Sequence, residues 1–413
     1  MGNKNIPEVR FTGFTGAWKE CKLGNMANFS KGNGYSKSDL TAEGKPVILY
    51  GRLYTKHETV IKSVDTFTIE KEKSVISKGN EVIVPSSGET SEDISRASVV
   101  NNPGIILGGD LNIIKPSNEI NSVFLALTIS NGKQQKELTK RAQGKSVVHL
   151  HNSDLKEVNL LYPEKDEQIK IGSFFEQLDD IIALHQQELT TLKQTKQGFL
   201  QKMFPKEGES VPEVRFPGFT GNWKQRKLKD LLESAYQGIN TAGDKVEYSD
   251  SGVKVLQSKH ITSGTISFDD ARYLDKDRYS EYFPKYVPDV DDILFANIGT
   301  IGPSTVVTDS KEFLIAWNIL KMTPSNEANS RFIQLQLQRL NSQRYFEKVT
   351  TGNATKFVNK DEMLGTQIVV PEKKEQSKIG DLFANLDHII TRQQCELDVL
   401  KETKKAFLQK MFV

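Results

Sequence analysis

Few residues of this 413-residue chain combine in a way that could support catalysis. His149 and His151 are two positions apart, but no third metal ligand lies near them, and we interpret them as ordinary strand or loop residues. The chain has no phosphate-binding GxxxxGK[ST] loop, and the GTIG segment at 299–302 lacks the spacing of a dinucleotide-binding turn. Acidic residues at 89–93 follow two serines, and such loops are usually solvated. Because no nucleophile, base and orienting group occur together, we predict that the chain is not an enzyme.

Clusters of basic residues are more informative. The segment 133–145, KQQKELTKRAQGK, holds five basic residues and one acidic residue. A corresponding stretch at 331–360 holds six basic residues, and both stretches are interleaved with amide and hydroxyl side chains. This mixture suits contacts to phosphates and base edges. A solvated helix face is the better explanation of either stretch alone, and their recurrence at equivalent places brings a nucleic-acid interface nearly level with it.

A second patch combines basic and aromatic residues. It reads YGRLYTKH from Tyr50 to His57, and it has a partial counterpart in QSKH from Gln257 to His260. Aromatic rings beside cations can serve nucleic-acid contacts, so we include this patch among the candidate binding residues.

Two long segments position these patches. The segment Glu167–Phe204 returns as Glu375–Phe412 at an offset of 208, and both end in FLQKMF. Apolar residues recur at steps of three and four in both copies, which predicts helices that each carry one apolar stripe. Each 38-residue segment corresponds to roughly 57 Å of helix. Neither stripe can be buried alone, so we predict that the two helices pack together as a coiled coil.

The opening of the chain also repeats. PEVRF, GF.G and Trp18 at the beginning return as PEVRF, GF.G and Trp223, at an offset of 205. The chain is therefore a tandem repeat of about 205 residues, each unit a variable body followed by a constant helix. If the helices run antiparallel, the end of the chain returns near its beginning, and the whole could close into a ring-like object.

The bodies have diverged but keep short apolar runs bounded by turn residues, which predict strands. In the first body these runs are Val47–Tyr50, Thr66–Ile69, Glu81–Val84, Ile105–Leu107 and Leu111–Ile114, and in the second Val253–Leu256, Asp292–Phe295, Ser304–Val307 and Phe313–Ala316. Pro116-Ser117-Asn118 corresponds to Pro324-Ser325-Asn326, and the turn 85–88 corresponds to 296–299. Helical stretches follow at Val123–Gln143 and Phe332–Thr351, so we expect mixed α+β bodies.

Composition agrees with a soluble globular protein of two or three domains. Apolar residues make up 37% of the chain and charged residues 26%, and no apolar run approaches the length of a membrane span. Two cysteines give no disulfide framework, and the N-terminus lacks the apolar core of a signal peptide, so a reducing, cytoplasmic location is expected. The net charge of +2 is modest for a nucleic-acid binder unless its basic residues cluster.

The combination of both repeats resembles the specificity subunit of type I restriction–modification systems. Each body is opened by PEVRF.GF.G.W and closed by EQ.KIG..F..LD..I...Q.EL..LK.TK..FLQKMF, and the match covers essentially the whole chain. The resemblance implies an α+β tandem repeat of two target recognition domains separated by an antiparallel coiled coil. The expected division is 1–165 for the first domain, 166–206 for the central helix, 207–373 for the second domain and 374–413 for the last helix.

The resemblance also implies a non-catalytic DNA-recognition subunit. Each body would read one half of a bipartite, asymmetric site in double-stranded DNA, and the helices would space the bodies and dock two modification subunits. Those partners would supply adenine methylation with S-adenosylmethionine, and restriction subunits would add ATP-driven translocation and nuclease activity with Mg. No cofactor or metal is expected on this chain.

Candidate residues follow from the patches, turns and apolar stripes. The candidate DNA-binding residues are Tyr50, Arg52, Tyr54, Lys56, Ser86, Ser87, Lys140, Arg141, Gln143, Lys145, Ser146, Gln257, Ser258, Lys259, Asn297, Thr300, Arg344, Asn353, Thr355 and Lys356. The candidate helix-pairing and partner-docking residues are Phe175, Leu178, Ile182, Leu189, Leu192, Phe199, Phe383, Leu386, Ile390, Leu397, Leu400 and Phe407.

Two other classes of protein remain open from the residues alone. The first is a coiled-coil scaffold whose bodies bind other proteins; it predicts no DNA affinity and gives no reason for the paired basic stretches. The second is an enzyme with an unfamiliar site in one body, which a turnover assay on the chain would reveal.

Overall fold

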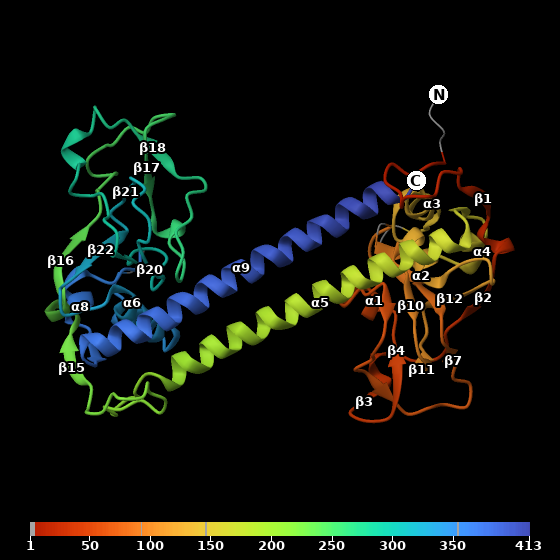
Figure 1. The fold of residues 1–413 in the computed structure, drawn as a ribbon, viewed down its shortest axis with the longest axis horizontal. Helices are drawn as coiled ribbons and strands as arrows, with labels where there is room; N and C mark the ends of the chain where they lie inside the picture. Colours follow the sequence, from red (N-terminus) through yellow and green to blue (C-terminus); the bar gives the residue numbers. More distant parts are fainter. Residues whose placement is uncertain (1–4, 92, 145–146, 353–354) are drawn as a thin grey trace. The chain divides into compact units, whose positions relative to one another are not determined.

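A computed structural model describes residues 5–91, 93–144, 147–352 and 355–413. The chain forms two compact units (Figure 1): unit 1 comprises residues 1–188 and 394–413, and unit 2 comprises residues 189–393. Each long helix therefore contributes one part to unit 1 and the other part to unit 2. The division at residues 165, 206 and 373 expected from the sequence stays a prediction.

Unit 1 contains a mixed sheet in the strand order β2-β12-β8-β10-β5 and a second sheet in the order β3-β6-β4-β11-β7. Its strands are β1 (Lys19–Lys22), β2 (Ala27–Lys31), β3 (Leu40–Thr41), β4 (Lys45–Ile48), β5 (Val60–Ile61), β6 (Phe67–Thr68), β7 (Ile76–Lys78), β8 (Glu81–Pro85), β9 (Ser87–Gly88), β10 (Ser98–Val100), β11 (Pro103–Leu107), β12 (Leu111–Pro116), β13 (Val148–His149) and β14 (Asn159–Tyr162). Its shorter helices are α1 (Arg52–Thr55), α2 (Ser122–Ile129), α3 (Gly132–Arg141) and α4 (Asn152–Lys156).

Unit 2 repeats this architecture with fewer strands, in the orders β16-β22-β19-β20 and β18-β17-β21. Its strands are β15 (Lys224–Lys227), β16 (Leu232–Gln237), β17 (Val253–Leu256), β18 (Arg272–Leu274), β19 (Ile293–Ala296), β20 (Ser304–Val306), β21 (Leu314–Ile315), β22 (Ile319–Pro324) and β23 (Gln367–Val370). Its shorter helices are α6 (Ser330–Ser342), α7 (Tyr345–Val349) and α8 (Lys360–Gly365), with a 3-10 turn at Ser258–His260.

The register between β4 and β11 in unit 1 and that between β17 and β21 in unit 2 show the same offset of 208 that relates the helices. Val47 pairs with Ile106 in unit 1, and Val255 pairs with Leu314 in unit 2. The predicted strands all fall on observed strands, which confirms the mixed α+β bodies. The predicted helix Val123–Gln143 is broken into α2 and α3, because Asn131 is extended and Gly132 takes a left-handed φ of 68°. Its counterpart breaks at Arg344, whose φ is 57°.

The cores lie between the sheets and the short helices. In unit 1, α2 covers β8 and β10 (Figure 1), and its Leu125 and Ile129 are buried with Val82, Val84 and Val99. The two middle residues of each strand contribute side chains to opposite faces, so both faces of the sheet carry apolar groups. Fully burying each such side chain stabilises the fold by about 1.5–3 kcal/mol relative to exposure. The core therefore fixes the strand ends at which the polar turns begin.

The long helices are α5 (Lys165–Lys202) and α9 (Lys373–Met411). In unit 1 the ring of Phe174 near the start of α5 lies 5.2 Å from that of Phe407 near the end of α9. In unit 2 the ring of Phe204, just beyond α5, lies 6.3 Å from that of Phe383 near the start of α9. In each unit the beginning of one helix thus lies beside the end of the other, which confirms the predicted antiparallel packing (Figure 1).

Both helices are shifted from the predicted ranges. Each begins two residues earlier than predicted, directly after a proline-containing turn, and each ends before its last phenylalanine. Pro205 disfavours helical geometry at Phe204, which instead packs on Trp223 and Phe332 with centroid separations of 5.9 and 5.5 Å. The conserved ending of the two repeats is therefore an anchor that joins each helix to a body.

The end of the chain returns to its beginning within unit 1, as predicted for antiparallel helices. The backbone N–H of Val9 donates to the carbonyl oxygen of Lys410 at 3.0 Å, and the ammonium of Lys410 pairs with Glu8 at 2.8 Å. Unit 2 makes the matching backbone bond within the continuous chain, from Val214 to Lys202 at 2.9 Å. The same joint is thus closed covalently in unit 2 and by non-covalent contacts in unit 1.

Candidate nucleic-acid interface

Three loops meet in unit 1 where strand β8 ends and strand β12 begins. The turn after β8 is joined to the turn before β12, because the backbone N–H of Ser86 donates to the carbonyl oxygen of Asp110 at 2.8 Å. It is also joined to the loop before α4, because Leu150 donates to the Ser86 carbonyl oxygen at 3.0 Å. The buried amide of Asn112 donates to the Leu150 carbonyl oxygen at 2.8 Å, which ties the third loop to the sheet. We call this meeting point the loop junction.

Unit 2 forms the same loop junction from different residues. Asn297 donates through its backbone to Asn318 at 3.3 Å, and Val358 donates to Asn297 at 2.9 Å. The Asn297 side chain donates to the Val358 carbonyl oxygen at 3.1 Å, and Gly299 donates through its backbone to Lys356 at 3.1 Å. The echo between turns 85–88 and 296–299, suggested by the sequence, is therefore a true structural equivalence.

The aromatic part of the patch at Tyr50–His57 joins the junction in unit 1. The hydroxyl of Tyr54 donates to the carbonyl oxygen of Ser87 at 2.7 Å, and the Tyr50 ring lies 6.2 Å from the Tyr54 ring. The guanidinium of Arg96 lies 5.9 Å from the Tyr54 ring centre. Burial, with the Asp93 carboxylate nearby, raises the pKa of Tyr54 well above its usual value, so this hydroxyl stays protonated as a donor. Tyr50 remains 38% exposed beside it.

The cations of that patch behave differently from one another. Arg52 has a 9% exposed side chain that pairs with Asp65 at 2.6 Å and with Glu58 at 2.8 Å, so its guanidinium is committed to internal contacts. Lys56 is exposed and lies 3.6 Å from Asp65. The structure therefore gives Arg52 a role in holding the loop, whereas Lys56 faces solvent.

The counterpart patch in unit 2 sits beside the junction. Ser258 is buried, and its backbone N–H donates to the Asn318 side chain at 3.2 Å. The side chain of Asn318 donates in return to the Ser258 hydroxyl at 3.1 Å. Gln257 is half-buried, whereas Lys259 is exposed. Only Lys259 of this patch thus presents a charged group to solvent at the junction.

Several candidate residues are used internally rather than presented to solvent. Ser86 is 6% exposed and Asn297 is 2% exposed, and both hold the junctions through the bonds described above. Arg141 pairs with Glu137 at 2.8 Å on α3. These side chains are therefore engaged in contacts within the protein.

Some of the exposed candidates lie on loops that adjoin the junctions, whereas Lys140 lies on α3 and Arg344 lies between α6 and α7. In unit 1 the backbone of Gln143 forms a two-way bridge with His149, whose backbone also pairs with Ser87 of the junction turn. Besides Tyr50, Lys56 and Lys259, the exposed candidates are Lys140 and Gln143 in unit 1, and Thr300, Arg344, Thr355 and Lys356 in unit 2. Lys145, Ser146 and Asn353 lie outside the described residues.

Sequence reasoning missed the turns that complete the junctions, which are Gly108–Asp110 in unit 1 and Ala316–Asn318 in unit 2. Trp317 is 40% exposed at the tip of the second turn, and Gln237 donates through its side chain to the Trp317 carbonyl oxygen. The offset of 208 places Trp317 opposite Gly109, and that alignment was the available signal. The letters GGD and AWN share no residue, so the equivalence is visible only in the backbone bonds.

The candidate helix-pairing residues divide into buried and half-buried sets. Phe175, Leu178, Leu189, Phe383 and Leu397 are buried, and Ile182, Leu192, Phe199, Leu386, Ile390, Leu400 and Phe407 are half-buried. Phe175 and Phe383 lie in equivalent aromatic clusters with Phe412 and Phe204, respectively. Phe175 therefore packs the start of α5 against the segment that follows α9, and Phe383 packs the start of α9 against the segment that follows α5.

A repeated ion pair fixes the opening segment of each unit to the start of a long helix. Arg10 donates two bonds to Glu167 at 2.6 and 2.7 Å, and Arg215 makes the same pair of bonds to Glu375 at the same distances. Glu167 and Glu375 are 1% and 0% exposed. The hydrogen bonds to the carboxylates raise the pKa of both guanidinium groups. Bidentate geometry of this kind gives both strength and a fixed orientation.

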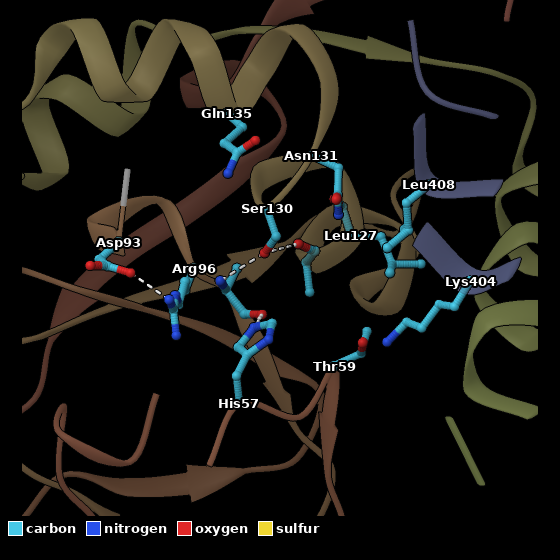
Figure 2. Close-up of a pocket in the computed structure, with 12 residues that line it drawn as sticks. His57, Thr59, Asp93, Arg96, Leu127, Ser130, Asn131, Gln135, Lys404 and Leu408 are labelled. Atoms are coloured by element: carbon cyan, nitrogen blue, oxygen red, sulfur yellow. Dashed lines mark hydrogen bonds and ion pairs between the residues drawn. The ribbon is translucent and has the colours of Figure 1, made fainter. Parts of the chain in front are cut away.

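A cavity of about 330 Å³ lies in unit 1 between the body and the last turns of α9 (Figure 2). Its polar walls are internally bonded: Ser130 accepts from the backbone of Ala97 at 2.9 Å, and Arg96 pairs with Asp93. Lys404 on α9 pairs with Asp179 of α5. The cations that line this cavity are therefore neutralised by neighbouring carboxylates, and the cavity is best described as a joint between body and helix.

The described residues also bear on other classes of function. Among the described residues, no three His, Cys, Asp or Glu side chains are grouped closely enough to hold a metal ion. The stacked rings of His149 and His151 lie 6.3 Å apart, and both residues are exposed. Within the same described ranges, no helix has the length and apolar character needed to cross a membrane.

The fold and the paired junctions define a tandem protein that carries two equivalent but diverged binding units on a helical frame. The model of the type I restriction modification DNA specificity domain matches residues 16–194 and 220–401, and the chain belongs to this family. It is thus a type I restriction–modification specificity subunit with two tandem recognition domains, which is a DNA-recognition subunit and not a catalytic one.

Known proteins resemble the chain along most of its length. The specificity subunit of the type I restriction enzyme MjaIX from Methanocaldococcus jannaschii is 22% identical over 326 residues, which cover 77% of this chain and 74% of that protein. The crystal structure of the S subunit from M. genitalium has a TM-score of 0.66 at 14% identity and covers 99% of both chains. A chain from a study of type I complex assembly and conformational transition has a TM-score of 0.52 at 15% identity, covering 95% and 96%.

Proposed function

We propose that each unit reads one half of a bipartite, asymmetric site in double-stranded DNA, and that its loop junction is the reading surface. The observation that carries the proposal is the recurrence of the junction on one framework with different residues in its loops. A framework that repeats fixes the same geometry twice, and loops that differ provide two different sets of contacts. Two such units on one chain suit a site whose halves have different sequences.

The chemistry of the exposed loop residues supports the same proposal. Lys140 and Gln143 in unit 1, and Lys259, Thr355 and Lys356 in unit 2, combine cations with amide and hydroxyl groups. Cations engage phosphates and set affinity, whereas amides and hydroxyls can discriminate base edges. The modest net charge of +2 is compatible with this role if partner subunits neutralise further phosphates.

We further propose that α5 and α9 act as a spacer between the half-sites. Helices of 38 and 39 residues correspond to about 57 Å each, and their packing against one another makes them stiffer than a single helix. Half-site centres are then expected one or two DNA turns apart, at ~34 Å per turn.

The outer faces of the helices are proposed to dock two modification subunits. Ile181 on α5 and Ile389 on α9 occupy equivalent positions and are 44% and 46% exposed, unlike the buried residues that pair the helices. An exposed apolar position that recurs at the same place in both repeats fits two copies of one partner. These partners would carry S-adenosylmethionine, and restriction subunits would bring ATP and Mg.

Variants of these positions test the docking proposal. Ile181→Glu and Ile389→Glu should each remove one modification subunit from the assembly without unfolding the chain, because both side chains are largely exposed. Native mass spectrometry gives the stoichiometry, and Ser173→Glu, at an exposed polar position of α5, is the matched control. Two bound subunits in both isoleucine variants would exclude this docking surface.

The DNA-reading proposal is tested by mapping methylated bases in cells that express this chain with its cognate modification subunit. The expected result is one new bipartite motif with methyladenine in both halves. Assembly of the complex without any such motif would contradict the proposal and favour a scaffold that binds other proteins.

A further inference from the structure

Trp317 is an exposed tryptophan on a rigid turn. The sequence holds three tryptophans, and the other two, Trp18 and Trp223, are each 3% exposed at equivalent places in the two cores. Trp317 is 40% exposed, at the tip of the turn that joins β21 to β22. Exposing much of an indole to water forgoes the stabilisation that burial of so large an apolar group would give.

The turn that carries Trp317 is held from several sides. The backbone N–H of Trp317 donates to the carbonyl oxygen of Ile239 at 2.7 Å, and the carbonyl oxygen of Trp317 accepts from the Gln237 side chain. The next residue, Asn318, exchanges side-chain bonds with Ser258 at 3.1 and 3.2 Å. Gly238 permits the close approach, because a Cβ there would collide with the carbonyl oxygen of Ala316. The indole is therefore presented in a fixed place and not on a loose loop.

The framework does not require an indole at this position. In unit 1 the turn Gly108–Asp110 keeps two of the backbone bonds. Ser86 donates to Asp110 at 2.8 Å where Asn297 donates to Asn318 at 3.3 Å, and Gly108 donates to Ile48 at 2.9 Å where Ala316 donates to Leu256 at 2.8 Å. The residue opposite Trp317 is Gly109, which has no side chain. Because the same turn forms without a ring in unit 1, folding does not explain the exposed ring in unit 2.

The surroundings of the ring indicate what could cover it. Ser258, which is bonded to Asn318, is followed by the exposed Lys259. Asn297, which donates to Asn318, lies on the turn that is bonded through Gly299 to the exposed Lys356. An exposed aromatic ring on a junction with two exposed lysines matches the chemistry of double-stranded DNA, whose base edges offer apolar contacts such as the thymine methyl group and whose phosphates attract cations.

We propose that Trp317 is a specificity-determining residue of unit 2, and that its indole is buried against the bases of the half-site that this unit reads. The inference rests on the proposed DNA-reading function. Gly109 leaves unit 1 without this contact, so the two half-sites are read by different means: a ring in unit 2, and the loops alone at the matching point of unit 1.

Fluorine NMR on the assembled methyltransferase tests the proposal directly. The chain is labelled with 5-fluorotryptophan, combined with unlabelled modification subunits, and titrated with duplex DNA that contains the methylated motif. The three resonances are assigned with Trp317→Phe. Cognate DNA should shift the Trp317 resonance and protect it from a soluble paramagnetic quencher, while the Trp18 and Trp223 resonances stay in place. DNA with the unit 2 half-site scrambled should leave it unshifted.

A substitution provides the second measurement. Trp317→Ala should lower affinity for cognate DNA by about 10-fold, because an apolar contact with base edges is lost, and should relax selection only at the unit 2 half-site. Val290→Ala is the matched control, since it removes an exposed apolar side chain of unit 2 just before β19, at the other end of that strand from the junction, and it should leave affinity unchanged.

The outcomes separate the inference from the function on which it rests. If the wild-type assembly binds its motif but the Trp317 resonance does not respond, or Trp317→Ala binds as tightly as the wild type, the inference is overturned and the function stands. If the wild-type assembly has no DNA affinity, the proposed function itself fails.

Discussion

The two units share a framework and differ in the loops set upon it. The paired contacts Arg10–Glu167 and Arg215–Glu375 have the same geometry, and the buried amides of Gln168 and Gln376 bridge equivalent turns. The junction turns, in contrast, carry Gly109 in one unit and Trp317 in the other. Repeated residues therefore mark the parts that must fit a helix, whereas divergent residues mark the parts free to acquire separate targets.

A second difference lies where each body meets the helices. In unit 1, Thr59 donates to Asp179 at 2.9 Å, and Lys62 pairs with Glu176 and Asp180 of α5 at 3.2 and 2.8 Å. The helix positions equivalent to Glu176 and Asp180 are Ala384 and His388, which cannot accept a lysine in the same way. The two carboxylates that accept from Lys62 in unit 1 thus have no carboxylate counterpart in unit 2, whereas Asp179 has one in Asp387.

The largest expected effect tests whether the shared ion pairs are equivalent. Arg10→Met and Arg215→Met should each destabilise their own unit by about 3–5 kcal/mol, because each leaves a buried carboxylate without its cation. Urea unfolding of variants that retain only Trp18 or only Trp223 reports unit 1 or unit 2 separately. A cost below ~1 kcal/mol in either unit would show that its pair does not hold the opening segment.

A smaller effect should distinguish the two joints between body and helix. Asp179→Ala removes the partner of both Lys404 and Thr59, whereas Asp387→Ala removes the partner of Lys196. Asp179→Ala should lower the free energy of unfolding by about 0.5–1.5 kcal/mol more than Asp387→Ala does, because that is the net contribution of one hydrogen bond. The same single-tryptophan variants provide the measurement, and equal costs would remove the proposed difference between the joints.

The lysine at the unit 2 junction should affect DNA affinity through charge alone. Lys356→Ala should reduce the slope of log affinity against log salt concentration for the assembled methyltransferase by about 1. The residue of unit 1 that corresponds to Lys356 is the buried Val148, so unit 1 has no cation at this position to remove. Lys356→Arg, which keeps the charge, should retain the full slope. An unchanged slope in the alanine variant would remove Lys356 from the interface.

The smallest effect is a difference in pH sensitivity at equivalent positions. Arg52 in unit 1 corresponds to His260 in unit 2, which is buried and accepts from the backbone of Gln257 at 2.8 Å. Burial, with nearby Lys259, lowers the pKa of His260 below 6.5. The imidazole of His260 therefore binds a proton more readily in the unfolded chain than in the folded one. The contribution of His260 to stability is present above pH 6.5 and is lost as the pH falls through the lowered pKa.

His260→Asn tests this pH dependence, because asparagine can accept the same backbone bond without titrating. Unit 2 of the variant should lose less stability than the wild type between pH 7 and 5, whereas unit 1 should respond equally in both. Parallel pH profiles for unit 2 in the two proteins would contradict the assignment.

The sequence predicted the parts that depend on periodic packing. The apolar stripes of α5 and α9 follow from steps of three and four, and the strands follow from short apolar runs between turns. The echo Pro116–Asn118 with Pro324–Asn326 also marked the true offset of the bodies, because strand register cannot slip by one residue without turning its core face outward.

The candidate interface was less accessible from the sequence. Arg52 looked like a surface cation, but Asp65 and Glu58 surround it in the fold. Ser86 and Asn297 were identified at the correct turns, yet they are buried and hold other loops. Trp317 was missed because nothing in its neighbours predicts that a turn will hold it in the open. These roles depend on tertiary contacts, which residue type and spacing do not encode.

The central claim is that each unit reads its own half-site, and exchanging one body tests it most directly. Residues 212–373 are replaced by the corresponding body of another specificity subunit, and the methylated motif is mapped in cells that express the chimaera with the cognate modification subunit. The account predicts a motif in which one half changes while the other half is kept. Changes in both halves, or in neither, would contradict it.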